Sequence, residues 1–441
     1  MNAKQPKRKI NLPIVDIVST IVSIFAIIFL ENSVSSLPFI GILIILTSLY
    51  MIFKYRKSGA ITLLIGILTL ISISFAYSVC LNTQSTAFNW QIPLINTESN
   101  IVNAKNFLLF LSILSLSIGK IRIKEKETIT AEKAPSESIA KSKYVPVMIV
   151  GCVLILLYAL IFGFDRGTIG SYASNTNVIY EYALIVFIFA WQYTKNNKAF
   201  KIFLIIYAIL YCSQGLLFGD RSSCFPMILA MLILNSKNNI KMKYVLIVGF
   251  LGILSANIID IFRNTGDLFS ASTLQETLSR GLFVNTISYS FYGGTQILRY
   301  GLSLSTGQRL THMLNYASSF ITGGSNKYNL TVMADAAGFL NKGGGLSSNY
   351  FYFWGGFIGV IIFAIIIGRI INYVFSHNSK LCDIFKITLT IFSIRWFVYY
   401  PTAFFRTALF VPLVGYYISK FFSNRIHQET EKLAISERTT I

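Results

Sequence analysis

The sequence predicts an all-α integral membrane protein with about twelve transmembrane helices, both termini in the cytoplasm and one large external loop between spans 9 and 10. Hydrophobic residues make up 54% of the 441 residues and charged residues only 13%, which is more apolar surface than a water-soluble domain of this length can bury. Apolar runs of membrane-spanning length recur along the chain. Lysine and arginine gather between alternate runs, as the positive-inside rule requires.

Twelve segments qualify as candidate spans, since crossing a bilayer as a helix takes roughly 17 to 25 mainly apolar residues. They are residues 14–31, 37–53, 60–80, 104–119, 145–164, 178–194, 201–218, 222–236, 243–262, 351–371, 384–401 and 403–421. The first is long for a signal peptide and no small-residue cleavage site follows it, so we expect it to remain as a span. The sequence does not fix the ends of the short eighth span, or of the last two, which little more than Pro401 separates.

The basic residues set the orientation of these spans. With the N-terminus inside, 27 of the 38 lysines and arginines fall in or beside cytoplasmic segments. The chain then divides into four parts: 1–144, with spans 1–4 and a basic cytoplasmic loop; 145–262, with spans 5–9; 263–350, the large external loop; and 351–441, with spans 10–12 and a cytoplasmic tail. The net charge of +20 is dispersed over helix ends, which argues against nucleic acid as a partner.

Arginine is unusually common on the predicted outer side. Of the 27 cytoplasmic basic residues 21 are lysines, whereas eight of the 11 outer ones are arginines. These eight are Arg166, Arg221, Arg263, Arg280, Arg299, Arg309, Arg395 and Arg406. Because the positive-inside rule disfavours them there, another interaction must favour them, and the planar guanidinium suits phosphate and carboxylate groups.

Local ion pairs and snorkelling are the alternatives to anion binding for these arginines. Asp–Arg pairs occur at 165–166 and 220–221. Arg395 and Arg406 instead lie within apolar runs, near the predicted outer end of the last two spans. An ionisable residue at that depth is costly and indicates a functional site, unless the side chain snorkels to the lipid headgroups.

The external loop 263–350 carries four arginines, twelve glycines and one of the three histidines. Two pieces of it are predicted to be helical, Thr273–Phe291 and Gln308–Phe320, with the sequences YGGTQ and LSTGQ between them. The apolar stretch 282–292 is too short to cross a membrane, so it fits an interfacial or re-entrant helix. The glycines permit tight turns and close approach of the backbone to a ligand, or flexible connections.

His312 and Asp335 are the candidate proton acceptors in this loop. His312 follows Arg309 by three residues, so the two side chains can be neighbours on one helical face. A nearby guanidinium disfavours protonation of the imidazole, which would leave a neutral general base beside an anion-binding group; a structural histidine is the alternative. The predicted site therefore comprises two catalytic residues, His312 and Asp335, and the substrate-binding residues Arg166, Arg221, Arg263, Arg280, Arg309, Arg395 and Arg406.

The chain lacks the usual signatures of several enzyme classes. No GKS phosphate loop, HExxH, DxD or GxSxG is present, so ATP-driven transport, zinc hydrolysis, metal-dependent sugar-nucleotide transfer and serine hydrolysis are not indicated. None of the five cysteines forms a CxxC pair, and structural thiols are expected, with a Cys80–Cys224 disulfide as the alternative.

Two short motifs resemble a known family. GDRSS at Gly219–Ser223 is similar to the short Gly-x-Arg element of Wzy-type O-antigen and capsule repeat-unit polymerases. GGGLSSNYFYFWGGFIG at Gly343–Gly359 resembles the end of the large periplasmic loop in these enzymes, where a Gly/Ser-rich stretch meets an aromatic helix start. The architecture of about twelve spans and one large late external loop is also similar. Members often carry a glutamate just before that helix start, where this chain has Asn349.

The resemblance implies an O-antigen polymerase in the bacterial inner (plasma) membrane. Such an enzyme joins undecaprenyl-pyrophosphate-linked oligosaccharide repeat units at the periplasmic face, by glycosyl transfer that needs no metal and no other cofactor. The implied partners are these lipid-linked oligosaccharides, membrane lipid and a chain-length regulator protein. The outer arginines fit this chemistry, because preorganised cations stabilise the charge that develops on a pyrophosphate leaving group.

Two other functions are compatible with the same architecture. An O-antigen ligase of the same superfamily would transfer the finished polymer to a different acceptor. A transporter, such as the flippase for the same lipid-linked units, would be expected to show two related halves with substrate groups near the membrane midplane. The sequence has no internal repeat and its polar residues gather at the outer edge, which favours surface chemistry.

Overall fold

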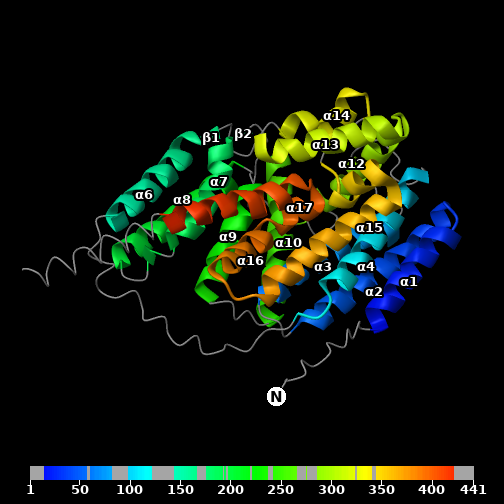
Figure 1. Ribbon diagram of the computed structural model, residues 1–441, viewed down its shortest axis with the longest axis horizontal. Helices are drawn as coiled ribbons and strands as arrows, with labels where there is room; N and C mark the ends of the chain where they lie inside the picture. Colours follow the sequence, from blue (N-terminus) through cyan, green and yellow to red (C-terminus); the bar gives the residue numbers. More distant parts are fainter. Residues whose placement is uncertain are drawn as a thin grey trace, which may run out of the picture.

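The computed structural model describes residues 14–56, 60–81, 98–121, 144–165, 175–191, 193–194, 197–218, 221–236, 242–265, 275, 286–322, 325–339 and 344–421. The described chain is mostly helical (Figure 1). Its helices are α1 (Ile14–Phe29), η1 (Val34–Ser36), α2 (Leu37–Tyr55), α3 (Ala60–Phe75), η2 (Ala76–Leu81), α4 (Glu98–Ile118), α6 (Tyr144–Phe162), α7 (Val178–Trp191), α8 (Lys198–Leu217), α9 (Arg221–Ser236), α10 (Met242–Thr265), α12 (Thr286–Leu302), α13 (Thr306–Thr322), η4 (Ser325–Tyr328), α14 (Leu330–Ala336), α15 (Ser347–Ser376), α16 (Lys380–Ile391), α17 (Ser393–Val398) and η5 (Ala403–Phe410). Two antiparallel two-residue strands, β1 (Phe164–Asp165) and β2 (Asn175–Thr176), lie between α6 and α7.

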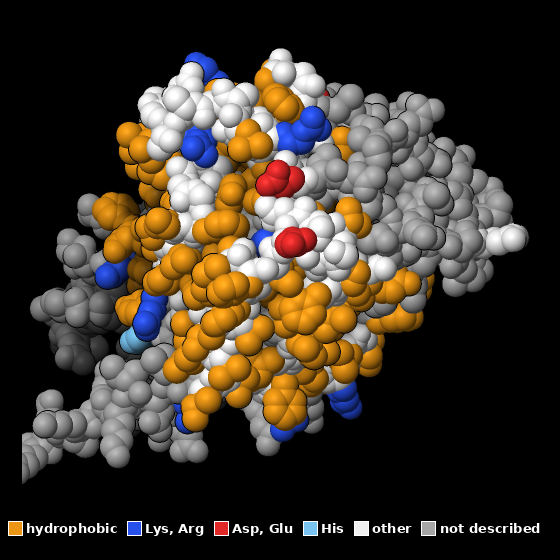
Figure 2. Space-filling view, turned by 90° about the vertical axis from the view of Figure 1, so that its right-hand side faces the viewer, with side chains coloured by type: hydrophobic (Ala, Val, Ile, Leu, Met, Phe, Trp, Pro, Cys, Tyr) orange, Lys and Arg blue, Asp and Glu red, His pale blue; other side chains and the backbone are white. Residues whose placement is uncertain are grey.

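The structure confirms a helical membrane protein. Each of the twelve predicted segments is largely helical, although 384–401 is divided between two helices, and among the described residues five helices are long and apolar enough to cross a membrane. These are Val34–Tyr55, Ile61–Leu81, Glu98–Ile118, Lys198–Leu217 and Ser347–Ser376. Figure 2 shows a broad hydrophobic surface on one face, with most charged side chains above it or along its lower edge. The count of twelve spans and their orientation remain predictions.

Helix α4 is the centre of the bundle, and its side chains are nearly all buried. It packs against α15, α1, α2 and α12, which lie together in Figure 1. Its aromatic residues Phe107 and Phe110 contact Phe397 of α17, with ring centroids 5.6 and 6.0 Å apart. In α15, a Cβ at Gly368 would meet the Cβ of Ser117 at 2.5 Å, so the two backbones approach as closely as small residues allow in membrane helices.

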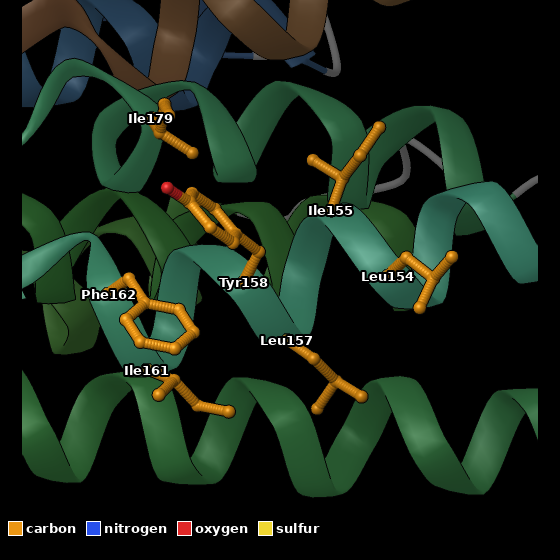
Figure 3. A pocket seen from close by; sticks show the side chains of 7 residues that line it. All are labelled: Leu154, Ile155, Leu157, Tyr158, Ile161, Phe162 and Ile179. Carbon is orange, nitrogen blue, oxygen red and sulfur yellow. The ribbon is translucent and has the colours of Figure 1, made fainter.

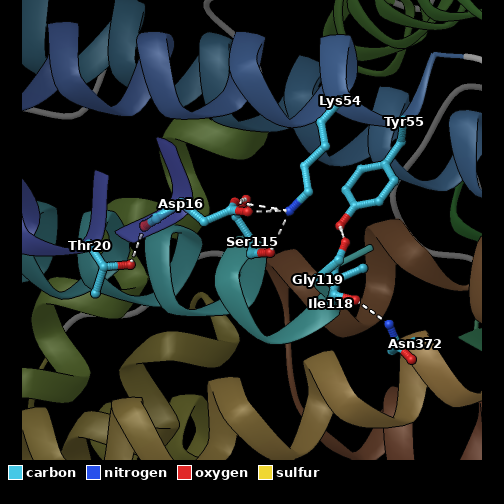
Figure 4. A network of polar contacts seen from close by, with 8 residues as sticks. All are labelled: Asp16, Thr20, Lys54, Tyr55, Ser115, Ile118, Gly119 and Asn372. Carbon is cyan, nitrogen blue, oxygen red and sulfur yellow. Dashed lines mark hydrogen bonds and ion pairs between the residues drawn. The ribbon is translucent and has the colours of Figure 1, made fainter. Parts of the chain in front are cut away.

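A buried ion pair joins α1, α2 and α4 (Figure 4). Asp16 of α1 is 0% exposed, and Lys54 of α2 donates to its two carboxylate oxygens at 2.9 and 2.7 Å. Ser115 of α4 donates its hydroxyl to the same carboxylate at 2.7 Å and accepts from Lys54 through its carbonyl at 3.0 Å. Paired charges with further hydrogen bonds are the form in which ionisable side chains are tolerated among apolar helices.

The loop helices α12, α13 and α14 lie together at one end of the bundle, at the top of Figure 1. Helix α13 confirms the predicted piece Gln308–Phe320, extended by two residues at each end. The prediction that YGGTQ separates two helices was wrong, because α12 runs through it. The glycines serve packing there: a Cβ at Gly294 would meet Asn349 Oδ1 of α15 at 2.1 Å. The described part of the chain covers only Gln275 and residues 286–291 of the other predicted piece.

The end of the chain is less regular than predicted. The segment 384–401 is not one helix, because α16 ends at Ile391 and the short α17 ends at Val398. Helix α17 is anchored to α16 by Trp396, whose Nε1 donates to the carbonyl of Leu389 at 3.0 Å. After Pro401 the chain winds as a wide π-helix, η5, and continues as an α-helix over residues 411–421. Helix α15 is kinked, with Gly356 at φ +59°, a conformation that favours glycine.

Candidate functional site

Arg395 and Glu181 form an ion pair between two apolar helices. The Nη1 atom of Arg395 in α17 lies 3.0 Å from Glu181 Oε1 in α7. The arginine side chain is 8% exposed and the carboxylate side chain 29%. Segments far apart in the sequence thus place a nearly buried guanidinium against a carboxylate that still reaches the surface. This arrangement pairs Arg395 with a carboxylate of the protein.

Arg406 approaches the same end of α7. Its guanidinium carbon lies 5.7 Å from the ring centroid of Tyr182, a cation–π contact. The hydroxyl of Tyr400, in the turn between α17 and η5, interacts electrostatically with Arg395 and Glu181. We call Glu181, Tyr182, Arg395, Tyr400 and Arg406 the arginine cluster. It holds two cations and one carboxylate, so it retains positive charge for an anionic ligand.

A stacked tyrosine pair connects the arginine cluster to α8 and α9. The rings of Tyr180 and Tyr211 lie 4.2 Å apart, and each hydroxyl donates to the other residue's carbonyl, at 3.2 and 3.1 Å. Tyr211 also interacts with Arg395 and hydrogen-bonds the side chain of Ser223. Ser223 lies in the first turn of α9, which begins at Arg221 within the GDRSS motif. The motif therefore connects to the cluster through Ser223 and Tyr211; the side chain of Arg221 lies outside the described residues.

The loop helix α13 is seated on the turn that carries Tyr400. Thr402 donates to the hydroxyl of Tyr316 through its backbone N–H at 3.2 Å and through its own hydroxyl at 2.5 Å. Phe320, one turn further along α13, stacks on Phe405 of η5 at 5.4 Å. These contacts fix part of the predicted external loop against the last two apolar segments, beside the arginine cluster.

The remaining predicted arginines do not all join this cluster. Arg309 lies on α13, where its Nη2 donates to Thr306 at 3.3 Å, and Arg299 on α12 donates to Gln296 at 3.3 Å. The side chains of Arg166, Arg221, Arg263 and Arg280 fall outside the described residues. Of the predicted substrate-binding arginines, the structure thus brings together Arg395 and Arg406.

Both ring nitrogens of His312 are engaged. Trp354 Nε1 donates to Nδ1 at 2.9 Å, which requires Nε2 to carry the proton that it donates to the Tyr328 carbonyl at 2.9 Å. The imidazole is 6% exposed. Burial lowers the pKa of His312, and the bond to the Tyr328 carbonyl opposes that effect in part. The neutral form expected from the sequence is present, but burial causes it and not Arg309.

This geometry gives His312 the role of a structural link among α13, η4 and α15. The Nδ1 lone pair that a general base would use already accepts a hydrogen bond from an indole N–H. Taking a proton from a substrate would require that bond to break in a buried site. Asp335, the other predicted proton acceptor, is exposed on α14.

Asn349 occupies the position where the resembling family often has a glutamate. It is 0% exposed, and its Oδ1 accepts from the backbone N–H of Leu346 at 2.9 Å while its Nδ2 donates to Asn103 of α4 at 2.5 Å. Asn103 in turn donates to Phe291 and Thr295 of α12, at 3.0 and 3.1 Å. Asn349 therefore caps α15 and ties three helices together, with no access for a substrate.

Sequence reasoning missed Tyr182, Tyr400 and the one carboxylate of the cluster, Glu181. Its signal was present, because it is the one ionisable carboxylate within the apolar run VIYEYALIVFIFAW. A carboxylate in such a run needs a cation, and arginines in other predicted spans were available. Which arginine pairs with Glu181 depends on how the helices pack, and this cannot be predicted from the single sequence.

The described cysteines and surface grooves add no second chemical site. All five cysteines are free, so the alternative Cys80–Cys224 disulfide is not formed. The groove in Figure 3 is lined by α6 side chains and Ile179 of α7, and all seven lining residues are hydrophobic. Its residues Leu154 and Phe162 are 62% and 66% exposed, as expected for a surface that faces lipid. Among the described residues, no three His, Cys, Asp or Glu side chains gather as metal ligands.

Fold and site together define a helical membrane protein with a half-buried, partly neutralised arginine cluster in which Arg395 is buried. No family model matches the chain, and no curated protein or solved structure matches it significantly.

Proposed function

We propose that this protein is a membrane glycosyltransferase that joins oligosaccharide units carried on a polyprenyl pyrophosphate such as undecaprenyl pyrophosphate. The observation that carries the proposal is the meeting of Arg395 and Arg406 at the end of α7. Two guanidinium groups, that of Arg395 buried and that of Arg406 half-buried, suit a pyrophosphate, whose oxygens accept paired hydrogen bonds. The two family-like motifs support the same assignment, since GDRSS leads into α9 beside this cluster.

The proposed reaction is a direct transfer between two lipid-linked oligosaccharides. A hydroxyl oxygen of the acceptor sugar attacks the anomeric carbon of the donor, and the bond from that carbon to the pyrophosphate oxygen breaks. The pyrophosphate leaves with the electron pair, and the arginine cluster stabilises its added charge. Glu181 holds Arg395 in position without contacting substrate. Of the two predicted proton acceptors, we assign the hydroxyl proton to Asp335, because His312 is saturated and buried.

The polysaccharide ladder of a deletion strain tests this proposal. Rescue with wild type should restore long chains, whereas Arg395→Lys, which keeps the charge but loses the planar fork, should reduce polymer about 100-fold at equal expression. Arg369→Lys is the matched control, since Arg369 is exposed on α15 outside the cluster, and it should restore the full ladder.

The other outcomes identify the rival functions. Finished polymer that stays on its carrier lipid in the deletion strain would indicate a ligase. Single units trapped on the cytoplasmic side would indicate a flippase. A full ladder from both Arg395→Lys and Arg406→Ala would show that the arginine cluster does not act on the pyrophosphate.

A further inference from the structure

Gln214 is a buried amide without a hydrogen-bond partner. It lies in the last turn of α8 and is 8% exposed. Neither its Oε1 nor its Nε2 has a partner within the part of the chain that the structure describes. Burying such a group unpaired costs roughly 1–3 kcal/mol, and most buried polar groups in proteins are paired. A glutamine that serves only packing would be better replaced by an apolar residue of the same size.

Gln214 lies one helical turn from Tyr211, a residue that interacts with the arginine cluster. It shares the buried face of α8 with Tyr207 and Tyr211, at the spacing of successive helical turns. Tyr211 interacts with Arg395, and its ring stacks on Tyr180, the residue before Glu181. Gln214 therefore lies about one turn, ~5 Å along α8, beyond the residue that faces the cluster. A group attached to a phosphate held by the arginines would extend over such a distance.

The chemistry of the side chain indicates what that group is. A carboxamide presents an acceptor oxygen and a donor nitrogen next to each other, and carries no charge. Two neighbouring hydroxyls on a sugar ring present the complementary pair, one donating and one accepting. A phosphate, which only accepts, would leave Oε1 unpaired.

We propose that Gln214 binds two adjacent hydroxyls of the sugar attached to the pyrophosphate, and so selects which lipid-linked oligosaccharide is used. This inference rests on the proposed function. It assigns Gln214 a role in substrate specificity, while the arginine cluster acts on the leaving group.

The test compares Gln214→Met in the full-length protein, reconstituted in lipid nanodiscs, with wild type. Without substrate, the variant should melt at the same temperature as wild type or higher, because an unpaired buried amide is replaced by an apolar chain of similar length. With the lipid-linked repeat unit, its KM should rise about tenfold, the effect of roughly 1.4 kcal/mol in binding. A donor whose first sugar lacks one of the two hydroxyls should raise KM for wild type but not for Gln214→Met.

Gln296→Met is the matched control. Gln296 is also buried, at 4% exposure, but its Oε1 accepts from Arg299. Its replacement should lower the melting temperature and leave KM for the repeat unit unchanged.

Three results would overturn the inference. If Gln214→Met melts below wild type and keeps its KM, the glutamine is structural. If wild type polymerises and the variant has the same KM and kcat, the proposed function stands and the role of Gln214 is wrong. If wild type forms no polymer from lipid-linked units, the proposed function fails and the inference fails with it.

Discussion

Arg395 shows how a charged side chain is accommodated among apolar helices. Its guanidinium is nearly buried, and Glu181 supplies the opposite charge at 3.0 Å. Removing one partner of such a pair leaves an uncompensated charge, which costs far more than the intact pair contributes. Because the Glu181 carboxylate is partly exposed, the ion pair lies at the protein surface and not wholly in the interior.

His312 gives a prediction at the residue scale about pH. Its pKa in the fold is lowered by burial from the ordinary 6.5, so the native state holds a neutral ring while the unfolded chain takes up a proton. The stability from this histidine is present above about pH 6.5 and is lost as the pH falls. We expect the melting temperature to decline more steeply in wild type than in His312→Gln between roughly pH 8 and pH 5. His377→Gln is the control, since His377 is exposed and its removal should leave the wild-type slope. Equal slopes for wild type and His312→Gln would contradict this assignment.

At the scale of elements, the contact between α12 and α15 depends on the absence of a side chain. Gly294→Ala would place a methyl group 2.1 Å from Asn349 Oδ1, in a fully buried network that also holds Asn103. We expect this change to destabilise the protein by roughly 1–3 kcal/mol, because overpacking forces neighbouring groups to shift. Gly252→Ala in α10 is the control: nothing lies within 4 Å of its added carbon, and alanine favours a helix. The measurement is the melting temperature of each variant. If Gly294→Ala and Gly252→Ala melt at the same temperature, the close packing of α12 on α15 is contradicted.

The ion pair that joins α1, α2 and α4 gives a second prediction at this scale. Asp16→Asn should reduce stability by about 3–5 kcal/mol, because Lys54 is left charged and buried. The double variant Asp16→Asn with Lys54→Met removes both charges and should recover much of that loss. Lys380→Met, at an exposed position, should change little. The measurement is the unfolding midpoint in detergent, and a double variant as unstable as the sum of the two single variants would contradict coupling between the two charges.

At the scale of the whole molecule, the apolar runs were sufficient to predict the helices. Every predicted segment is largely helical, because hydrophobicity over membrane length is a local property. The features that shape the site were not predictable in this way. The Arg395–Glu181 pair joins α17 to α7, and the indole that saturates His312 comes from α15. Such contacts depend on which helices become neighbours, and a single sequence does not specify that.

The same distinction explains the errors in the external loop. The two glycines of YGGTQ, taken by themselves, predict a break between helices. In the structure they lie within α12, where Gly294 packs against Asn349. RLTH suggested that Arg309 keeps His312 neutral, whereas burial among aromatic residues does so. The arginine excess on the predicted outer side was the pattern that led to the cluster, and it was visible because it opposes the expected distribution of charge.

The central claim, that the arginine cluster promotes glycosyl transfer from a lipid pyrophosphate, is tested most directly with purified protein. The wild-type chain would be reconstituted with undecaprenyl-pyrophosphate-linked oligosaccharide as the sole substrate, with a metal chelator present. We predict a ladder of lipid-linked oligomers with wild type and with Arg369→Lys, and a rate about 100-fold lower with Arg395→Lys. If wild type produces no oligomers from this substrate, or if Arg395→Lys produces them at the wild-type rate, the claim is wrong.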